Sequence, residues 1–205
     1  TALYKIVAEA NTIISRIPFS ELSDADKKLF EARGRFFRAF AYRTLAYLWG
    51  GVPLVTEEIV TPRVDFVRAS KDDIIKQVIE DLKFAAANLP AIAVVKDGEI
   101  SNLAAQHLLA EVYLAAGQHQ NAVTAASVVI DDPATDLMLT RFGSRLSFAA
   151  DVYFDLFQVK NQNRKSANNR EGIWVIQFET DVPGGGAVAT AMAGSYQLER
   201  VHVPL

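Results

Sequence analysis

The strongest pattern in the chain is a long stretch at residues 27–49, where apolar side chains recur at intervals of three and four residues. This spacing predicts an α-helix with one broad apolar face. Ser23 stands where the N-cap is expected, and Asp26 follows three residues later, as in the aspartate form of a capping box. The glycine pair at 50–51 predicts the C-terminal end, because glycine readily adopts the left-handed conformation of a helix cap. The aromatic side chains of the apolar face, including Trp49, are expected to be buried against other helices.

Five further segments have the periodicity or the caps of helices. Ser70 begins one of them, and Gly117 separates two others. Pro18 and Pro90 each follow the end of a segment. The five segments are residues 2–17, 70–89, 101–116, 118–131 and 151–157. In residues 173–179, Trp174, Ile176 and Phe178 occupy alternate positions and so share one face, which predicts a short strand.

Residues 101–131 form an alanine-rich pair of predicted helices. Their small and large side chains follow the spacing of a tetratricopeptide helix pair, at Ala110, Tyr113, Gly117, Ala122 and Ala126. The helices expected at 27–49 and 71–89 could form a degenerate partner pair, although the sequence has no clean repeat. These patterns predict an all-α fold of tetratricopeptide-like helix pairs, with irregular loops and a short strand near the C-terminus.

Composition restricts the possible functions without identifying one. The 205 residues are 50% hydrophobic and 22% charged, as expected for one sizeable globular domain. The net charge of −3 gives no support to a nucleic-acid partner. The absence of cysteine excludes disulfides, cysteine metal sites and a cysteine nucleophile. No apolar run approaches the roughly 20 residues of a membrane-spanning helix.

No arrangement of residues in the sequence points to catalysis or to a bound metal. The three histidines, His107, His119 and His202, are far apart, and each is expected to be satisfied or to face solvent. The glycine run at 184–186 lacks the strand, the helix and the lysine of a phosphate-binding loop. An all-α hydrolase would need paired carboxylates facing one cleft, and the sequence places none. We therefore expect a protein without enzymatic activity and without a cofactor.

Three other features are candidates for structural or binding roles. Arg35 can pair with Glu31 four residues earlier, and the neighbouring Arg33, Arg38 and Arg43 either extend to solvent or pair with carboxylates of other helices. Asn11 lies beside the apolar face of its helix, where it either faces solvent or binds a backbone group of a neighbouring loop. Tyr196 lies in an irregular, glycine-containing segment at 180–200. A loop-borne tyrosine can stack against the apolar face of a sugar ring, so Tyr196 is the candidate ligand-binding residue.

Five pieces of the sequence, in order, carry a resemblance to a known family. They are Tyr4 with Ala10-Asn11; Arg35, Arg38-Ala39, Tyr42 and Leu45 followed by Gly50-Gly51-Val52-Pro53-Leu54-Val55; Arg68-Ala69-Ser70 with Ile79, Asp81-Leu82, Ala85 and Leu89-Pro90; Ala104-Ala105, Leu108-Leu109-Ala110, Val112-Tyr113-Leu114 and Gly117; and Phe157, Glu171, Ile173-Trp174 and Gln177-Phe178. In this order and spacing the chain resembles the SusD/RagB family, the outer-membrane nutrient-binding lipoproteins of Bacteroidetes.

The resemblance implies an α-helical superhelix of tetratricopeptide-like pairs whose loops carry the ligand site. It implies a surface-exposed outer-membrane lipoprotein, anchored through a lipid on an N-terminal segment missing here, that associates with a SusC-like TonB-dependent transporter. The ligand would be a glycan or oligosaccharide, or a peptide, and it would be bound without catalysis. Most ligand residues of the family have no counterpart in this sequence, so only the segment at 180–200 is carried over.

The chain opens directly in helical periodicity and without an initiator methionine, so we expect one domain truncated at both ends. Residues 1–132 would form its helical scaffold, and residues 133–205 its loop-rich, ligand-facing segment. The alternative is a tetratricopeptide-type scaffold that binds a protein or peptide. Accessible aromatic side chains near Tyr196 would favour a glycan, whereas a groove lined by the helices at 101–131 would favour a peptide.

Overall fold

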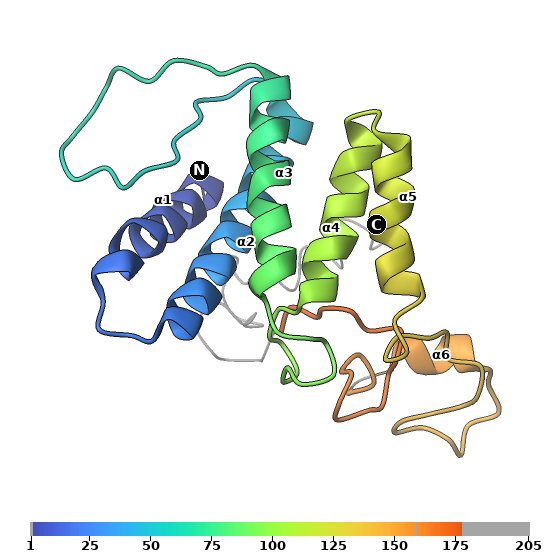
Figure 1. Ribbon diagram of the computed structural model, residues 1–205. Helices are drawn as coiled ribbons and strands as arrows, with labels where there is room; N and C mark the ends of the chain where they lie inside the picture. Colours follow the sequence, from blue (N-terminus) through green and yellow to red (C-terminus); the bar gives the residue numbers. More distant parts are fainter. Residues whose placement is uncertain (1, 159, 178–205) are drawn as a thin grey trace, which may run out of the picture.

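The computed structural model describes residues 2–158 and 160–177, and this part of the chain is helical. Its elements are α1 (Ala2–Arg16), the short 3-10 helix η1 (Ile17–Phe19), α2 (Asp24–Trp49), α3 (Lys71–Asn88), α4 (Asn102–Ala115), α5 (His119–Ile130) and α6 (Val152–Leu156). Figure 1 shows α1 to α5 in chain order across the molecule, with α6 and its loops beyond the ends of α4 and α5. The all-α prediction is confirmed.

Side-chain caps fix the starts of the long helices at the predicted residues. The hydroxyl oxygens of Ser23, Ser70 and Ser101 accept hydrogen bonds from backbone N–H groups of the first turns of α2, α3 and α4, at 3.1 to 3.2 Å. Each bond satisfies a donor that has no partner inside the helix. At the ends, Gly50 (φ 70°) follows α2 and Gly117 (φ 70°) joins α4 to α5, a conformation that other residues adopt at a cost.

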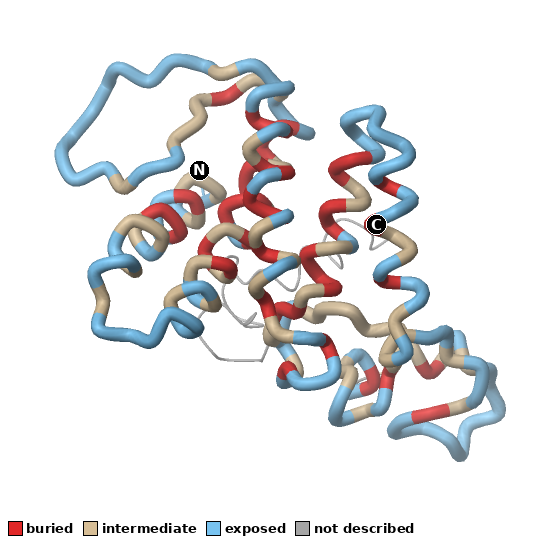
Figure 2. The backbone as a smooth tube through the Cα atoms, viewed as in Figure 1, coloured by how far each residue is buried: buried red, intermediate tan, exposed pale blue. Residues whose placement is uncertain are grey.

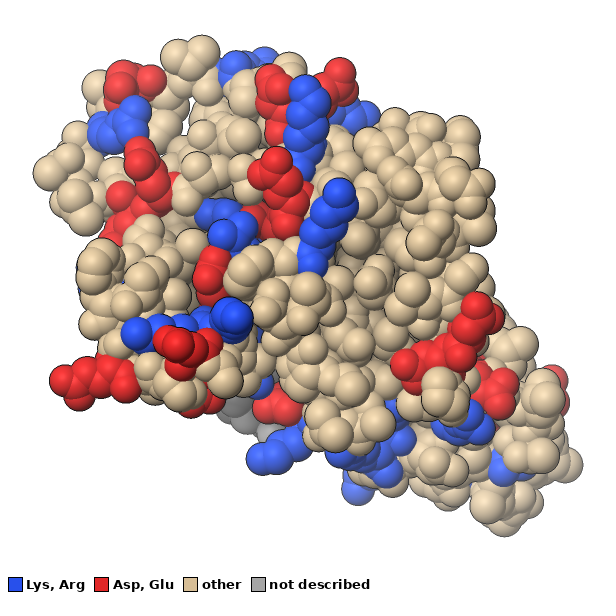
Figure 3. Space-filling model, in the orientation of Figure 1, with Lys and Arg blue, Asp and Glu red and all other residues tan. Residues whose placement is uncertain are grey.

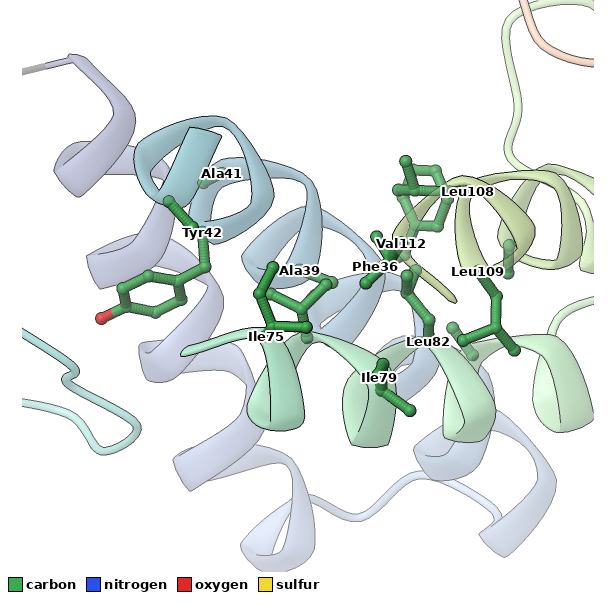
Figure 4. Packing of buried hydrophobic residues seen from close by; sticks show 14 of the residues in the cluster. Phe36, Ala39, Ala41, Tyr42, Ile75, Ile79, Leu82, Leu108, Leu109 and Val112 are labelled. Atoms are coloured by element: carbon green, nitrogen blue, oxygen red, sulfur yellow. The ribbon is translucent and has the colours of Figure 1, made fainter. Parts of the chain in front are cut away.

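The core lies where α2, α3 and α4 meet. Phe36 of α2, Leu82 of α3 and Val112 of α4 are each at most 1% exposed, and Figure 4 shows them together among smaller aliphatic side chains. In Figure 2 most of the buried residues lie on the inner faces of the helices, while the outer faces of the helices and most of the loop residues are exposed. Truncating such a side chain to alanine typically costs about 2–5 kcal/mol, because a cavity remains. This core therefore holds α2 in a fixed place between its neighbours.

The burial of α2 differs from the simple one-face prediction. Trp49 and Leu48 are 51% and 66% exposed, whereas Arg38 and Tyr42 are buried. The reason is that α2 packs against α1 as well as α3, so its buried surface extends around more than one side. Trp49 lies in the last turn, and its predicted burial was wrong.

The short strand predicted at 173–179 is not formed in the part that the structure describes, residues 173–177. Residues 173–177 have no strand partner there, and the Trp174 ring instead contacts Phe36, Phe37 and Phe40 of α2. Trp174 Nε1 donates a hydrogen bond to the Gly98 carbonyl at 3.2 Å. The adjacent residues Ile173 and Trp174 both pack on the core and Ile176 is 51% exposed, so the alternating pattern does not correspond to one buried side.

The α4–α5 pair is the predicted helix hairpin, and it is poor in charge. Among residues 102–130 the only charged side chain is Glu111. Figure 3 shows the corresponding tan area over α4 and α5. None of the helices in the described residues has the length and apolarity to cross a bilayer.

Residues 133–177 are shaped by buried polar side chains. Asp155 is fully buried, and its Oδ2 accepts hydrogen bonds from Arg141 Nε (2.5 Å) and from the Phe142 backbone N–H (2.9 Å). The hydrogen bond from the Arg141 guanidinium holds the pKa of the Asp155 carboxyl below its usual range. Asn161 Nδ2 donates to the backbone oxygens of Phe142 (3.3 Å) and Asp155 (3.0 Å). One acid and one amide thus hold together a loop that has little apolar core.

Candidate functional site

A buried arginine connects the first three helices. Arg38 of α2 is 3% exposed, and its Nε and Nη2 donate to the two carboxylate oxygens of Asp81 on α3 at 2.8 and 2.7 Å. Its Nη1 donates to Asn11 Oδ1 of α1 and to the Thr56 carbonyl, both at 2.9 Å. The bidentate pair satisfies both buried charges. Arg38 therefore fixes the start of the 51–70 loop relative to all three helices.

Two tyrosines and Asn11 complete the anchor of that loop. Asn11 Nδ2 donates to the Val55 carbonyl at 2.9 Å, which decides between the two predicted roles of this residue. Tyr42 donates to the same carbonyl at 3.0 Å and accepts from the Val55 N–H at 2.6 Å. Burial raises the pKa of Tyr42 to about 12, so the phenol keeps its proton at neutral pH. Tyr4 donates to the Pro53 carbonyl at 2.8 Å.

A sizeable cavity lies between α1 and this loop, and we call it the α1 cavity. Its volume is about 390 Å³, and it is lined by Tyr4, Val7, Ala8, Asn11, Thr12, Pro53, Val55, Glu57, Ile59 and Phe66. The walls are mainly apolar, and the polar groups of Tyr4, Asn11 and Thr12 already donate to backbone carbonyls. Of its polar side chains, the Glu57 carboxylate remains as an acceptor for a ligand, beside a 3.7 Å ion pair with Arg63.

A second cavity, which we call the Trp174 cleft, lies between α2, α4 and the segment after the 160–170 loop. Its volume is about 330 Å³, and it is lined by Phe36, Phe40, Arg43, Ala104, His107, Leu108, Glu111, Glu171, Gly172, Ile173 and Trp174. The Trp174 ring meets Phe36 and Phe40 edge to face, with centroid distances of 5.4 and 5.8 Å. These contacts fix the plane of the indole at the wall of the cleft.

Charged groups line the same cleft. Arg43 Nη2 pairs with Glu111 Oε2 at 3.0 Å, and the Arg43 guanidinium carbon lies 5.2 Å from the centre of the Phe40 ring. The Arg43 Nε is buried without a hydrogen-bond partner among the described residues. The Glu171 Oε1 accepts from the Met138 N–H at 2.6 Å, which fixes this carboxylate beside Trp174. The cleft therefore combines an aromatic wall with fixed donors and acceptors.

Sugar rings present apolar C–H faces and a ring of hydroxyl groups. A site for them needs aromatic surface together with hydrogen-bonding groups that are not already used inside the protein. The Trp174 cleft offers an indole with groups of both charges, whereas the α1 cavity offers the Glu57 carboxylate alone. Of these two cavities, the Trp174 cleft is therefore the better candidate site.

The other residues singled out from the sequence are dispersed. His107 is exposed at the edge of the cleft, and His119 is exposed at the start of α5. The described residues contain no cluster of His, Cys, Asp and Glu that could hold a metal ion. Tyr196, His202 and the segment at 180–200 lie outside the described residues.

Comparison with known proteins identifies the family. Residues 1–114, more than half of the chain, match the SusD-like_3 family model, described as starch-binding associating with outer membrane. The chain belongs to the SusD-like family. This membership and the helical structure confirm the family resemblance seen in the sequence, and the family is described by binding, not by catalysis.

Relatives of known sequence or structure agree. SusD-like protein P38 of Formosa agariphila is 31% identical over 203 residues, which are 98% of this chain and 37% of that protein. A laminarin-binding SusD-like protein superposes with a TM-score of 0.66 at 26% identity, covering 78% of this chain and 34% of that one. A crystal structure with a xylogluco-oligosaccharide gives a TM-score of 0.68 at 28% identity, covering 86% and 34%. This SusD-like chain spans about a third of the length of its curated relatives.

The sequence did not single out the residues of the cleft as ligand-binding. Trp174 was assigned to one face of a strand, and Arg43 to a run of arginines expected to pair with carboxylates. That pairing is confirmed for Arg43 with Glu111. The feature of the sequence that could have indicated a site is a tryptophan that comes directly after a polar loop.

Proposed function

We propose that this SusD-like chain is part of a non-catalytic glycan-binding protein of the bacterial outer membrane. It captures an oligosaccharide and delivers it to a SusC-like TonB-dependent transporter, while a lipid on an N-terminal segment anchors the protein at the cell surface. Residues 1–132 act as the scaffold, and residues 133–205 supply the ligand-facing part. The observation that carries the glycan proposal is the Trp174 cleft, where an indole lies beside a carboxylate and a guanidinium.

The proposal is tested by titrating the 205-residue chain with neutral and acidic oligosaccharides. Two tryptophans are present, so a Trp49→Phe background leaves Trp174 as the fluorescent reporter. A ligand that covers the indole should shift its emission, and calorimetry should give the matching heat. If no oligosaccharide produces heat or a spectral shift, the cleft is not a glycan site.

A matched pair of substitutions locates the site. Trp174→Ala removes the aromatic wall and should weaken glycan binding by about tenfold or more, since a base or ring stacked on an aromatic side chain contributes roughly 1–3 kcal/mol. Trp49→Ala removes an equally large side chain that is 51% exposed at the end of α2, and it should leave the affinity unchanged. Circular dichroism of both variants shows whether the helices remain folded. Equal loss in both variants would place the ligand elsewhere.

Tyr196 remains a proposed second stacking residue. A loop tyrosine could cover the face of the sugar opposite Trp174, so Tyr196→Ala should weaken binding further. The test is calorimetry of Tyr196→Ala alone and combined with Trp174→Ala. Unchanged affinity in the single variant would remove Tyr196 from the site.

The α4–α5 pair supports a docking role beside the glycan site. Leu114, Val123 and Ile130 are 60%, 58% and 74% exposed, on a hairpin whose only charged residue is Glu111. Exposed apolar surface of this kind is typical of protein contacts. We propose that the transporter contacts this surface, and the alternative partner is a peptide bound as in tetratricopeptide scaffolds.

Charge placed on this surface tests the docking proposal. In the full-length protein, Val123→Glu should reduce retention of the co-expressed transporter in a pull-down, because a charge would be buried at the contact. Ala87→Glu adds the same charge on the exposed side of α3 and serves as the control. If both variants retain the transporter, α4–α5 does not dock it. If Val123→Glu instead loses a bound peptide, the scaffold alternative is favoured.

A further inference from the structure

The charges that line the Trp174 cleft are unequal in number. They comprise one cation, Arg43, and two carboxylates, Glu111 and Glu171. His107 lies exposed at the edge of the cleft and is counted as neutral here. The lining therefore carries a net charge of about −1 at neutral pH.

The single cation is already compensated. Arg43 pairs with Glu111 at 3.0 Å, and its guanidinium also lies over the rings of Phe40 and Tyr47, at 5.2 and 5.7 Å from their centres. The Nε is buried without a hydrogen-bond partner among the described residues, and the N–H groups of the guanidinium that Glu111 does not use can donate to a hydroxyl or ring oxygen. A carboxylate ligand would have to compete with Glu111 for this one positive charge.

Glu171 has no such compensation. Its carboxylate is held by the Met138 N–H at 2.6 Å, and no ion pair to Glu171 occurs among the described residues. A carboxylate at the wall of a cleft accepts hydrogen bonds from sugar hydroxyls, and it repels a second anion.

We propose that the Trp174 cleft selects neutral hexose glycans and rejects glycans that carry carboxylate groups, an inference that rests on the proposed glycan-binding function. Glu111 and Glu171 accept from hydroxyl groups, the Arg43 guanidinium donates to one oxygen, and Trp174 supplies the apolar wall. An anionic sugar would place a second negative charge beside Glu171, without a free cation to compensate it.

The test uses ligands that differ in charge and little else. β-1,3- and β-1,4-gluco-oligosaccharides are compared by calorimetry with the same chains oxidised at C6 to the uronate. The neutral form of at least one backbone should bind about tenfold or more tightly than its oxidised form at low salt. The ratio should fall as salt is raised, because exposed charges are screened.

Two variants assign the selectivity to the cleft. Glu171→Gln keeps an oxygen acceptor for the Met138 N–H and removes the charge, so it should reduce the neutral-to-oxidised ratio by about threefold or more. Glu80→Gln removes an exposed carboxylate on α3, away from the cleft, and should leave the ratio unchanged. Because both variants retain side-chain size, folding is expected to be preserved.

The outcomes separate this inference from the proposed function. Oxidised glycans that bind as tightly as neutral ones, or a ratio that Glu171→Gln does not change, would overturn the charge selection and leave glycan binding intact. Absence of heat with every glycan would reject the glycan function itself.

Discussion

The helical scaffold and the loop-rich segment are stabilised in different ways. All members of the main hydrophobic cluster in the described residues lie between Val7 and Ala125. In residues 133–177 the buried side chains are instead Phe142, Asp155, Asn161 and Asn169, three of them polar. Apolar packing is non-directional and holds helices together over a wide area, whereas a buried carboxylate or amide fixes particular backbone groups.

The difference explains how one chain can hold a cleft of defined shape. The wall from α2 and α4 is as rigid as the core behind it. The wall that includes Trp174 is set by the ring contacts with Phe36 and Phe40 together with hydrogen bonds, such as the one that Trp174 donates to Gly98 and the one that Glu171 accepts from Met138. We therefore expect substitutions of single polar groups to alter the loop wall locally, and the following experiments test that contrast.

The largest effect is expected at Asp81, a polar exception within the apolar scaffold. Asp81→Ala leaves the buried Arg38 charge without its carboxylate, which should reduce the free energy of unfolding by about 3–5 kcal/mol. Thermal unfolding of a chain of this size should shift down by roughly 6–20 °C. Glu80→Ala, at the adjacent exposed residue, is the control, and its unfolding temperature should be almost unchanged. A small shift for Asp81→Ala would mean that apolar packing alone holds the scaffold.

Gly143 is expected to give a large but local effect. Its φ is 79°, and an added Cβ would lie 2.1 Å from the Asn161 side-chain oxygen. Gly143→Ala therefore combines backbone strain with a steric clash, together roughly 2–4 kcal/mol. Hydrogen exchange should accelerate in residues 140–161 and remain slow in α2 to α4.

Gly117 is the matched control for that substitution. It has the same sign of φ, at 70°, but no atom lies within 4 Å of an added Cβ. Gly117→Ala should cost only about 1 kcal/mol, from the backbone alone. If both variants behave alike, the Asn161 contact has no role in shaping the loop.

Acid should open the loop-rich segment before the scaffold. The Arg141 hydrogen bond lowers the pKa of the Asp155 carboxyl in the folded state. Its stabilising contribution is therefore complete above the ordinary aspartate pKa of about 4, and it is lost as pH falls through the lowered value. Emission of Trp174 in the Trp49→Phe background reports the opening, and far-ultraviolet circular dichroism reports the helices. Asp155→Asn should remove the acid dependence, and a simultaneous loss of both signals would contradict the proposed order.

The smallest effect concerns the anchor of the 51–70 loop. Tyr4→Phe removes one hydrogen bond, to the Pro53 carbonyl, and should cost about 0.5–1.5 kcal/mol. Tyr153→Phe, on an exposed tyrosine of α6, is the control and should have no effect on urea unfolding. A larger loss for Tyr4→Phe would indicate that the anchor acts as one unit with Arg38 and Asn11.

Much of the scaffold could be predicted from the sequence, because its signals are local. The Ser23 cap, the end of α2 at Gly50 and the pairing of Arg35 with Glu31 at 2.7 Å all depend on neighbours within four residues. The exposure of Trp49 could not be predicted, because helical phase does not show where the neighbouring helices end.

The loop-rich segment gave fewer correct predictions for a physical reason. Asp155 and Arg141 are 14 residues apart in the chain, and neither belongs to a periodic pattern. The 173–177 part of the predicted strand packs on helices that are distant in sequence. The cleft forms where three segments that are distant in the sequence meet. No local pattern indicates such a meeting point, so the sequence did not reveal this cleft.

The contact at Asp97 has a consequence for the order of folding. Its carboxylate accepts the backbone N–H groups of Lys165 and Ser166 at 2.8 and 3.0 Å, across separations of 68 and 69 residues. Helices α1 to α5 instead each pack against the next along the chain, and such local contacts form quickly. Closing the long loop is slow by comparison, since its entropy must be lost before any contact is gained. We therefore expect the helices to assemble first and Trp174 to dock last, so that nascent chains lack the cleft until their final folding step.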